Sequence, residues 1–141
     1  MTTGETDLAT LLRMLEPVLD GNEWVFVSVG DSEVPKYMPH ALASFREKEA
    51  MTLVIPHIEA TEVQHSSAPM ARITLAVHSS LEAVGLTAAV SRALANDGIS
   101  ANMIAAYHHD HVFVPLALAD RAMNCLRGLS RAGTSFDQRA R

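Results

Sequence analysis

The sequence has one cysteine, few aromatic residues and no long apolar run, and each shortage excludes a class of protein. Cys125 cannot form a disulfide within the chain, so nothing ties the fold to an oxidising compartment. No apolar run approaches the ~20 residues that a membrane-spanning helix needs. The polar, acidic start MTTGETD lacks the basic and apolar regions of a signal peptide. We therefore expect a cytoplasmic protein without membrane contacts.

Positive charge is also scarce. Lysine and arginine number 11 against 16 aspartate and glutamate residues, and the net charge is −5. Phosphate backbones are bound by basic surfaces, so we expect no nucleic-acid partner. Apolar residues, in contrast, are plentiful at 48%, and most are alanine, valine and leucine. This composition suits helices packed on a sheet, and 141 residues fit one domain or two small units that share a core.

The first half of the chain opens with a helical pattern. Four leucines recur at helical spacing from Leu8 to Leu15, and Thr6 or Asp7 is available as the N-cap. The other elements predicted for this half are a turn at 20–22, a strand at 24–29 buried on both faces, a loop at 30–40, a hairpin of strands at 43–46 and 51–55, a short helix at 56–63 and a loop at 65–69.

The second half has clearer periodicity. Ile73, Leu75 and Val77 alternate with more polar residues, which predicts a half-buried strand. A helix follows whose apolar stripe includes Leu86, and Gly98 ends it. The other elements predicted for this half are a strand at 99–107, a turn at 108–110, a strand at 111–114, a helix that ends at Leu129 and a frayed, polar segment from Ser130.

The order of these elements predicts the fold class. The second half runs strand, helix, strand, strand, helix, and the first half offers a similar order although no residue-level repeat is visible. Both orders are those of a split βαβ arrangement, in which helices cover one face of an antiparallel sheet. We therefore predict an α+β protein with ferredoxin-like βαββαβ units.

The most informative stretch for function lies between the strand at 72–77 and the following helix. Ser79 and Glu82 fit the S-x-x-E capping box, which would place Gly85 inside the helix at a cost of ~1 kcal/mol relative to alanine. A helix that starts near Gly85 would avoid that cost. Glycine also allows close approach to the backbone, either by a neighbouring strand or by an anionic ligand at the helix N-terminus. Both interpretations stay open at this point.

The run SSLEAVGLTAAVSRALANDGISANMIAAYHHDHVFVP resembles the strand, glycine loop, helix and strand of ACT domains. More narrowly, the chain from about Asp7 to Leu129 resembles a family of short bacterial proteins with two tandem ACT-like units. The pieces that carry this resemblance are FREKEAMTLVIP, ITLAVHSSLEAVGLTAA and HDHVFVP. The resemblance implies an N-terminal unit at 1–69 with an incomplete first helix, a C-terminal unit at 70–130 and a flexible tail at 131–141.

The same resemblance implies a regulatory or sensor protein that binds an amino acid or a related small carboxylate. ACT domains commonly bind such ligands between paired units, so a homodimer is one expected assembly. The acidic residue that usually precedes the loop glycine is missing, because Ala83 and Val84 stand there. Carried over position by position, the implied ligand contacts are Ser79, Ser80, Val84, Gly85, Leu86, Asn102, Met103 and Ile104.

Metal binding and hydrolysis are two other chemistries that the histidine and serine residues suggest. The run from His108 to His111 could place His109 and His111 on one strand face as metal ligands, with His78 nearby, but a turn explains it better. Ser79 or Ser80 beside His78 does not form a nucleophile and base, since neighbours in a strand point to opposite faces. We therefore predict no enzyme, no catalytic residue and no cofactor. A ligand-free pairing module and a metal-binding protein are the alternatives.

Overall fold

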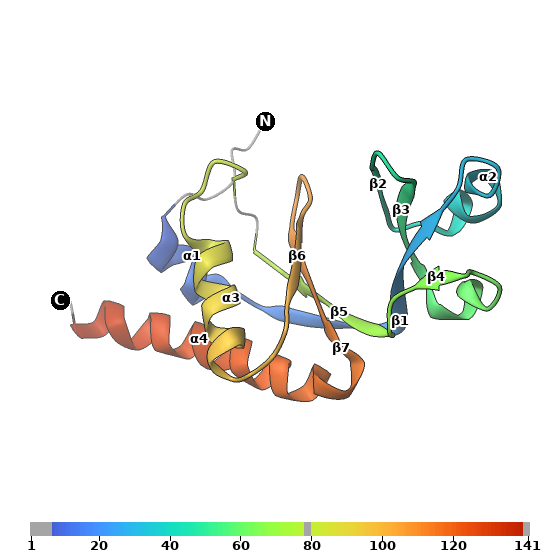
Figure 1. Cartoon of the computed structure of the whole chain (residues 1–141). Coiled ribbons are helices and arrows are strands. Elements are labelled where there is room, and N and C mark those ends of the chain that lie inside the picture. Colours follow the sequence, from blue (N-terminus) through green and yellow to red (C-terminus); the bar gives the residue numbers. More distant parts are fainter. Residues whose placement is uncertain (1–6, 78–79, 140–141) are drawn as a thin grey trace. The chain divides into compact units, whose positions relative to one another are not determined.

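The computed structural model describes residues 7–77 and 80–139, so the predictions that concern His78 and Ser79 lie outside the described residues. The chain divides into two compact units, and Figure 1 shows their helices and strands. Unit 1 comprises Met1–Asp20 and Arg72–Arg141, and unit 2 comprises Gly21–Ala71. The predicted boundary between residues 69 and 70 lies close to one of the two places where the chain passes between units.

Unit 2 is a small antiparallel sheet covered by short helices. Its strands are the second part of β1 (Pro17–Val29), β2 (Ala43–Arg46), β3 (Met51–Pro56) and β4 (His65–Ser66). Strand β3 lies between β1 and β2, and β4 pairs with β1, so the order is β2-β3-β1-β4. Helix α2 (Val34–Tyr37) and the 3₁₀ turns η1 (Met38–His40) and η2 (His57–Ala60) complete the unit.

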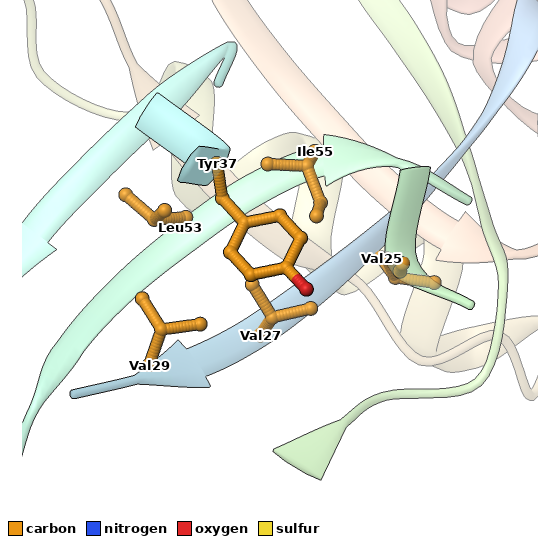
Figure 2. Packing of buried hydrophobic residues seen from close by; sticks show 7 residues of the cluster. Val25, Val27, Val29, Tyr37, Leu53 and Ile55 are labelled. Carbon is orange, nitrogen blue, oxygen red and sulfur yellow. The ribbon is translucent and has the colours of Figure 1, made fainter. Parts of the chain in front are cut away.

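The core of unit 2 lies under a single aromatic side chain. Tyr37 of α2 packs on the buried face of β1 and β3 together with Ala60 of η2 (Figure 2). That face is formed by alternate strand residues: Val25, Val27, Val29, Leu53 and Ile55. The hairpin predicted at 43–46 and 51–55 is confirmed, with Phe45 opposite Thr52 in the register.

In its described residues, unit 1 combines four strands with three longer helices. Strands β5 (Met70–Leu75), β6 (Asn102–Ala105) and β7 (Asp110–Pro115) follow β1 in the order β1-β5-β7-β6. Helices α1 (Leu8–Met14), α3 (Leu86–Asn96) and α4 (Ala119–Arg139, after the 3₁₀ turn η3, Leu116–Leu118) pack against one another (Figure 1). Their fully buried contacts include Leu11, Val90, Leu94 and Leu126.

Local signals explain where the unit 1 helices begin and end. The Asp7 carboxylate accepts a hydrogen bond from the Thr10 backbone N–H at 3.0 Å, which confirms Asp7 as the N-cap of α1. Gly98 has φ +72° just past the end of α3, as the sequence predicted. The alternation predicted for the second half is also confirmed, since Ile73, Leu75 and Val77 are buried.

Two predictions about β1 were wrong. The turn at 20–22 does not exist, because residues 20–22 lie inside one continuous strand from Pro17 to Val29. Strand β1 neighbours β5, and the Asp20 carboxylate pairs with Arg72 at 3.0 Å, so pairing with a distant strand overrides the local turn preference. The second prediction, burial on both faces of 24–29, fails at Ser28, which is exposed between the buried Val27 and Val29. At the start of this segment Trp24 and Val25 are buried on opposite faces.

Several predicted loops contain short regular elements instead. The segment at 30–40 includes α2, which has proline in its first turn, and η1. The segment at 65–69 includes β4, and the short helix predicted from Pro56 is the 3₁₀ turn η2. Conversely, β6 is shorter than the strand predicted at 99–107.

The last helix is longer than predicted. Helix α4 continues through Arg139, so its predicted end at Leu129 was wrong, and most of the segment expected to be a tail is helical. Among the described helices, none is both long enough and apolar enough to cross a membrane.

Candidate ligand site of unit 1

The loop that connects β5 to α3 ends at a glycine. Its described part begins at Ser80, whose hydroxyl accepts a hydrogen bond from the Glu82 backbone N–H at 3.1 Å. Helix α3 starts at Leu86, and Gly85 is its N-cap. The capping-box prediction was wrong because Glu82 lies in a turn before the helix. The alternative prediction, a helix that starts near Gly85, is confirmed.

The structure gives two physical reasons for glycine at position 85. Its φ of +103° lies in the region that disfavours residues with a Cβ. A Cβ at this position would also lie 2.9 Å from Cδ2 of Leu8 in α1. The close approach that the sequence suggested is therefore made by a helix side chain and not by a strand, and it requires no ligand.

Within the described residues, the N-terminus of α3 has no side-chain cap. No side chain of Gly85 can accept a hydrogen bond from the first helical N–H groups, and the first backbone bond of the helix runs from Ala89 N–H to the Gly85 carbonyl at 2.9 Å. Val84 is 83% exposed beside this helix start, whereas Leu86 is buried in the core of unit 1. Leu86 as a whole residue is only 3% exposed, so a ligand at this helix start would meet Val84 rather than the Leu86 side chain.

The three predicted contacts in β6 do not lie together at the loop end of the sheet. Thr74, next to the last residue of β5, has its hydroxyl 3.0 Å from Nδ1 of His111, and His111 pairs with Ile104. Thr74, His111 and Ile104 thus form a row near the end of β5 where the loop begins. Asn102 pairs with Phe113, two residues and about 7 Å further along β6.

Asn102 also differs from expectation in its environment. Its side chain is exposed at the start of β6, so its amide can bond to water and needs no protein partner. Met103, on the opposite face of the strand, and Ile104 are half-buried. Of the three residues, Ile104 is therefore the one that lies beside His111 and Thr74, at the end of the sheet where the β5–α3 loop begins.

Sequence analysis did not predict that the polar side chains of Arg72 and Thr74 on β5 lie beside His111 on β7. Arg72 pairs with Asp20 through Nη2 at 3.0 Å and through Nε at 3.2 Å. Burial of the His111 ring lowers its pKa below the ordinary value, and the positive charge of Arg72 lowers it further. A polar residue at every second position of β5, Arg72 and Thr74, was the available signal.

The histidine run forms the connection between β6 and β7. His108 and His109 lie in a turn closed by a hydrogen bond from Ala106 N–H to the His109 carbonyl at 3.0 Å, while Asp110 is the first residue of β7. The turn prediction is therefore confirmed for His108 and His109. Within residues 7–77 and 80–139, no group of three His, Cys, Asp or Glu side chains is placed to hold a metal ion.

Comparisons with known proteins agree with this fold. The ACT-domain family profiles match the chain twice, over residues 3–72 and over residues 69–128. A crystal structure from Vibrio cholerae, described as a protein of unknown function and possible transport protein, is 42% identical. The match covers 87% of this chain and 95% of that one, with a TM-score of 0.77. The protein therefore belongs to the ACT-domain family and carries two ACT domains in tandem.

More distant structures show the same fold. An Agrobacterium tumefaciens protein is 12% identical, with a TM-score of 0.63 over 82% of this chain and 89% of that one. The regulatory subunit of aspartate kinase from Thermus flavus is 10% identical, with a TM-score of 0.58 over 80% of this chain and 95% of that one. No match was found among curated proteins. The predicted α+β, ferredoxin-like class is thus confirmed.

Proposed function

We propose that this protein is a non-enzymatic regulatory module that binds an amino acid or a similar small carboxylate at the start of α3. The observation that carries the proposal is the helix N-terminus at Gly85, which has no side-chain cap. Backbone N–H groups at such a terminus, together with the helix dipole, favour a carboxylate. The ACT family supports the same class of function, and on the same ground we propose a non-catalytic, cytoplasmic role.

The proposed site centres on the helix start. Ser80, Val84 and Gly85 would surround the carboxylate, Leu86 would lie beneath it, and Ile104 is the nearest proposed contact from β6. Met103 and Asn102 remain outer members of the predicted set, and Ser79 lies outside the described residues. A ligand held there would act by favouring one arrangement of units or subunits over another.

A thermal-shift panel of amino acids and small carboxylates tests the proposal. A ligand present at a hundred times its dissociation constant adds ~2.7 kcal/mol of stability, which raises the melting temperature by several degrees. The decisive variant is Val84→Glu, because it places a carboxylate beside the helix start without disturbing a buried residue. We expect Val84→Glu to lose the shift and the neutral control Val84→Gln to keep it.

Two results would overturn this site. A hit that survives Val84→Glu unchanged would place the ligand elsewhere on the protein. A panel without any hit would favour the alternative, a ligand-free pairing module.

One observation supports that alternative. Strand β6 ends the strand order of unit 1 and β2 lies at the edge of the unit 2 sheet, where Phe45 is 70% exposed. Edge strands present unpaired backbone groups that a second chain can use. A stable homodimer in light scattering without added ligand would favour pairing, and a monomer would argue against it.

A further inference from the structure

Unit 1 contains a second pocket that shares no residue with the proposed site at α3. Its volume is about 410 Å³. One wall is the segment from the end of α1 to the start of β1, and the other is the middle third of α4. The lining residues are Leu15, Glu16, Pro17, Arg127, Ser130 and Arg131.

The walls of this pocket are held by contacts among three elements. The Ser130 hydroxyl donates a hydrogen bond to the Arg13 carbonyl at 3.3 Å, which ties α4 to the end of α1. The Ala76 N–H donates to the Glu16 carbonyl at 2.8 Å, which ties the same segment to the end of β5. Leu15 and Pro17 are buried and give the pocket an apolar floor. The pocket is therefore part of the packed unit.

The charge of the pocket differs from that of the whole chain. Arg127 and Arg131 lie one turn apart on the same face of α4, and Arg131 Nε donates to the Arg127 carbonyl at 3.3 Å. Glu16 is the one acidic residue of the lining. Two arginines and one glutamate leave a local charge of +1, whereas the chain carries −5.

Three cations outside the pocket pair with carboxylates. Lys36 pairs with Glu62 at 2.8 Å, Arg72 with Asp20 at 3.0 Å and Arg121 with Asp97 at 3.4 Å. The guanidinium of Arg127 instead lines a pocket with an apolar floor. A planar guanidinium donates two parallel hydrogen bonds to a carboxylate or phosphate, so an oxyanion is the ligand group that fits this wall of the pocket.

We propose that this pocket binds a small organic anion, a carboxylate or phosphate with a short apolar body. The anionic group lies against Arg127 and Arg131, and the apolar body lies on Leu15 and Pro17. Glu16 stands on the opposite wall and repels the anion, so it limits the affinity. The inference does not depend on the proposed site at α3.

Amide NMR titrations with butyrate and butyl phosphate test this inference. We expect saturable shifts at Leu15, Glu16 and Ser130, and the tighter of the two ligands identifies the anionic group. Butylamine, with the same apolar body and opposite charge, and sodium chloride at equal ionic strength are the controls. Neither control should produce saturable shifts at these residues.

Three variants sharpen the test. Arg127→Gln should weaken binding about tenfold, because hydrogen bonds to a charged group are lost. Glu16→Gln should strengthen it about two- to threefold, because a repulsion between partly exposed charges is removed. Arg92→Gln, on α3, makes the same change of net charge outside the pocket and should leave binding unchanged.

The inference is overturned if neither anion gives saturable shifts, or if Arg127→Gln and Arg92→Gln weaken binding equally. Val84→Glu separates the two sites, since it should abolish binding at α3 and leave butyrate binding at Arg127 intact. Failure at one site is therefore distinguishable from failure at the other.

Discussion

The two units share a strand order but cover their sheets with very different helices. In unit 2 the order is β2-β3-β1-β4, so the first strand lies between the third and the fourth and the second lies at the edge. Unit 1 has the same order, β6-β7-β5-β1, when its strands are counted from β5, and β1, although earlier in the chain, takes the fourth place. The helix after the first strand has 11 residues in unit 1 and 4 residues in unit 2. The second helix is α4, with 21 residues, in unit 1 and a four-residue 3₁₀ turn in unit 2.

This difference shows that strand pairing, and not helix length, maintains the ferredoxin-like order. Unit 1 buries its sheet under aliphatic side chains from three helices, such as Leu11, Val90 and Leu126. Unit 2 has too little helix for that, and one large side chain, Tyr37, covers its core. Within the described part of the chain, Tyr37 Oη is a buried oxygen without a hydrogen-bond partner.

The largest expected effect concerns the glycines of the two units. Gly85→Ala should lower the free energy of unfolding by about 1–3 kcal/mol, because φ is +103° and the new Cβ meets Leu8. Gly98→Ala, with φ +72° and open space, should lose about 1 kcal/mol from backbone strain alone. Gly30→Ala in unit 2 meets no atom within 4 Å and should be neutral or slightly stabilising.

Urea denaturation of the three alanine variants measures this order. Equal losses at Gly85 and Gly98 would mean that Leu8 moves aside without cost. A loss at Gly30 as large as at Gly85 would contradict the contrast between the units.

A smaller effect is expected for Tyr37→Phe in unit 2. Removing a buried hydroxyl without a hydrogen-bond partner removes a desolvation cost, so stability should be unchanged or rise by up to ~1 kcal/mol. The Lys36 ammonium lies 5.2 Å from the ring centroid, and Glu62 and then Tyr37 raise the pKa of Lys36. The Lys36 ammonium attracts the Tyr37 ring but does not donate a well-aligned hydrogen bond to the phenol oxygen.

Tyr107→Phe in unit 1 is the matched control, because Tyr107 is 67% exposed and its hydroxyl is hydrated in the folded and unfolded states alike. Its stability should change by less than ~0.5 kcal/mol. A loss above ~1 kcal/mol in Tyr37→Phe would show that the buried hydroxyl does have a partner in solution.

The smallest expected effect is a pH dependence in unit 1. Burial and Arg72 lower the pKa of His111 below its ordinary value of 6.5, so the unfolded chain binds a proton at higher pH than the folded protein. Stability from this source is therefore complete well above pH 6.5 and falls as the pH drops through that value. The effect is small because the ring is only partly buried.

Melting temperatures of the natural protein and of His111→Gln across this pH range measure the contribution. The natural protein should lose more stability on acidification than the variant. His65→Gln removes an exposed histidine from unit 2 and serves as the control. An identical pH profile for the natural protein and His111→Gln would contradict the prediction.

The elements that sequence analysis predicted are those with strong local signals. The leucines of α1, the alternation of β5 and the apolar stripe of α3 with Gly98 at its end all follow from nearby residues. For the candidate site, the same local reasoning offered a helix start near Gly85 as one of two alternatives. It could not identify Leu8 as the contact of that glycine, since the two residues are 77 positions apart in the chain.

The sequence by itself determined the fold class and the start of α1, because periodicity and capping are short-range properties, and its motifs carried the resemblance to the family. Only the tertiary structure decided that residues 20–22 continue a strand, that Asn102 lies away from the loop end of its sheet and that Arg127 and Glu16 line one pocket. Each of these depends on a partner that is distant in sequence. Strand pairing and helix packing choose such partners by burial and hydrogen bonding over the whole unit, which no local pattern records.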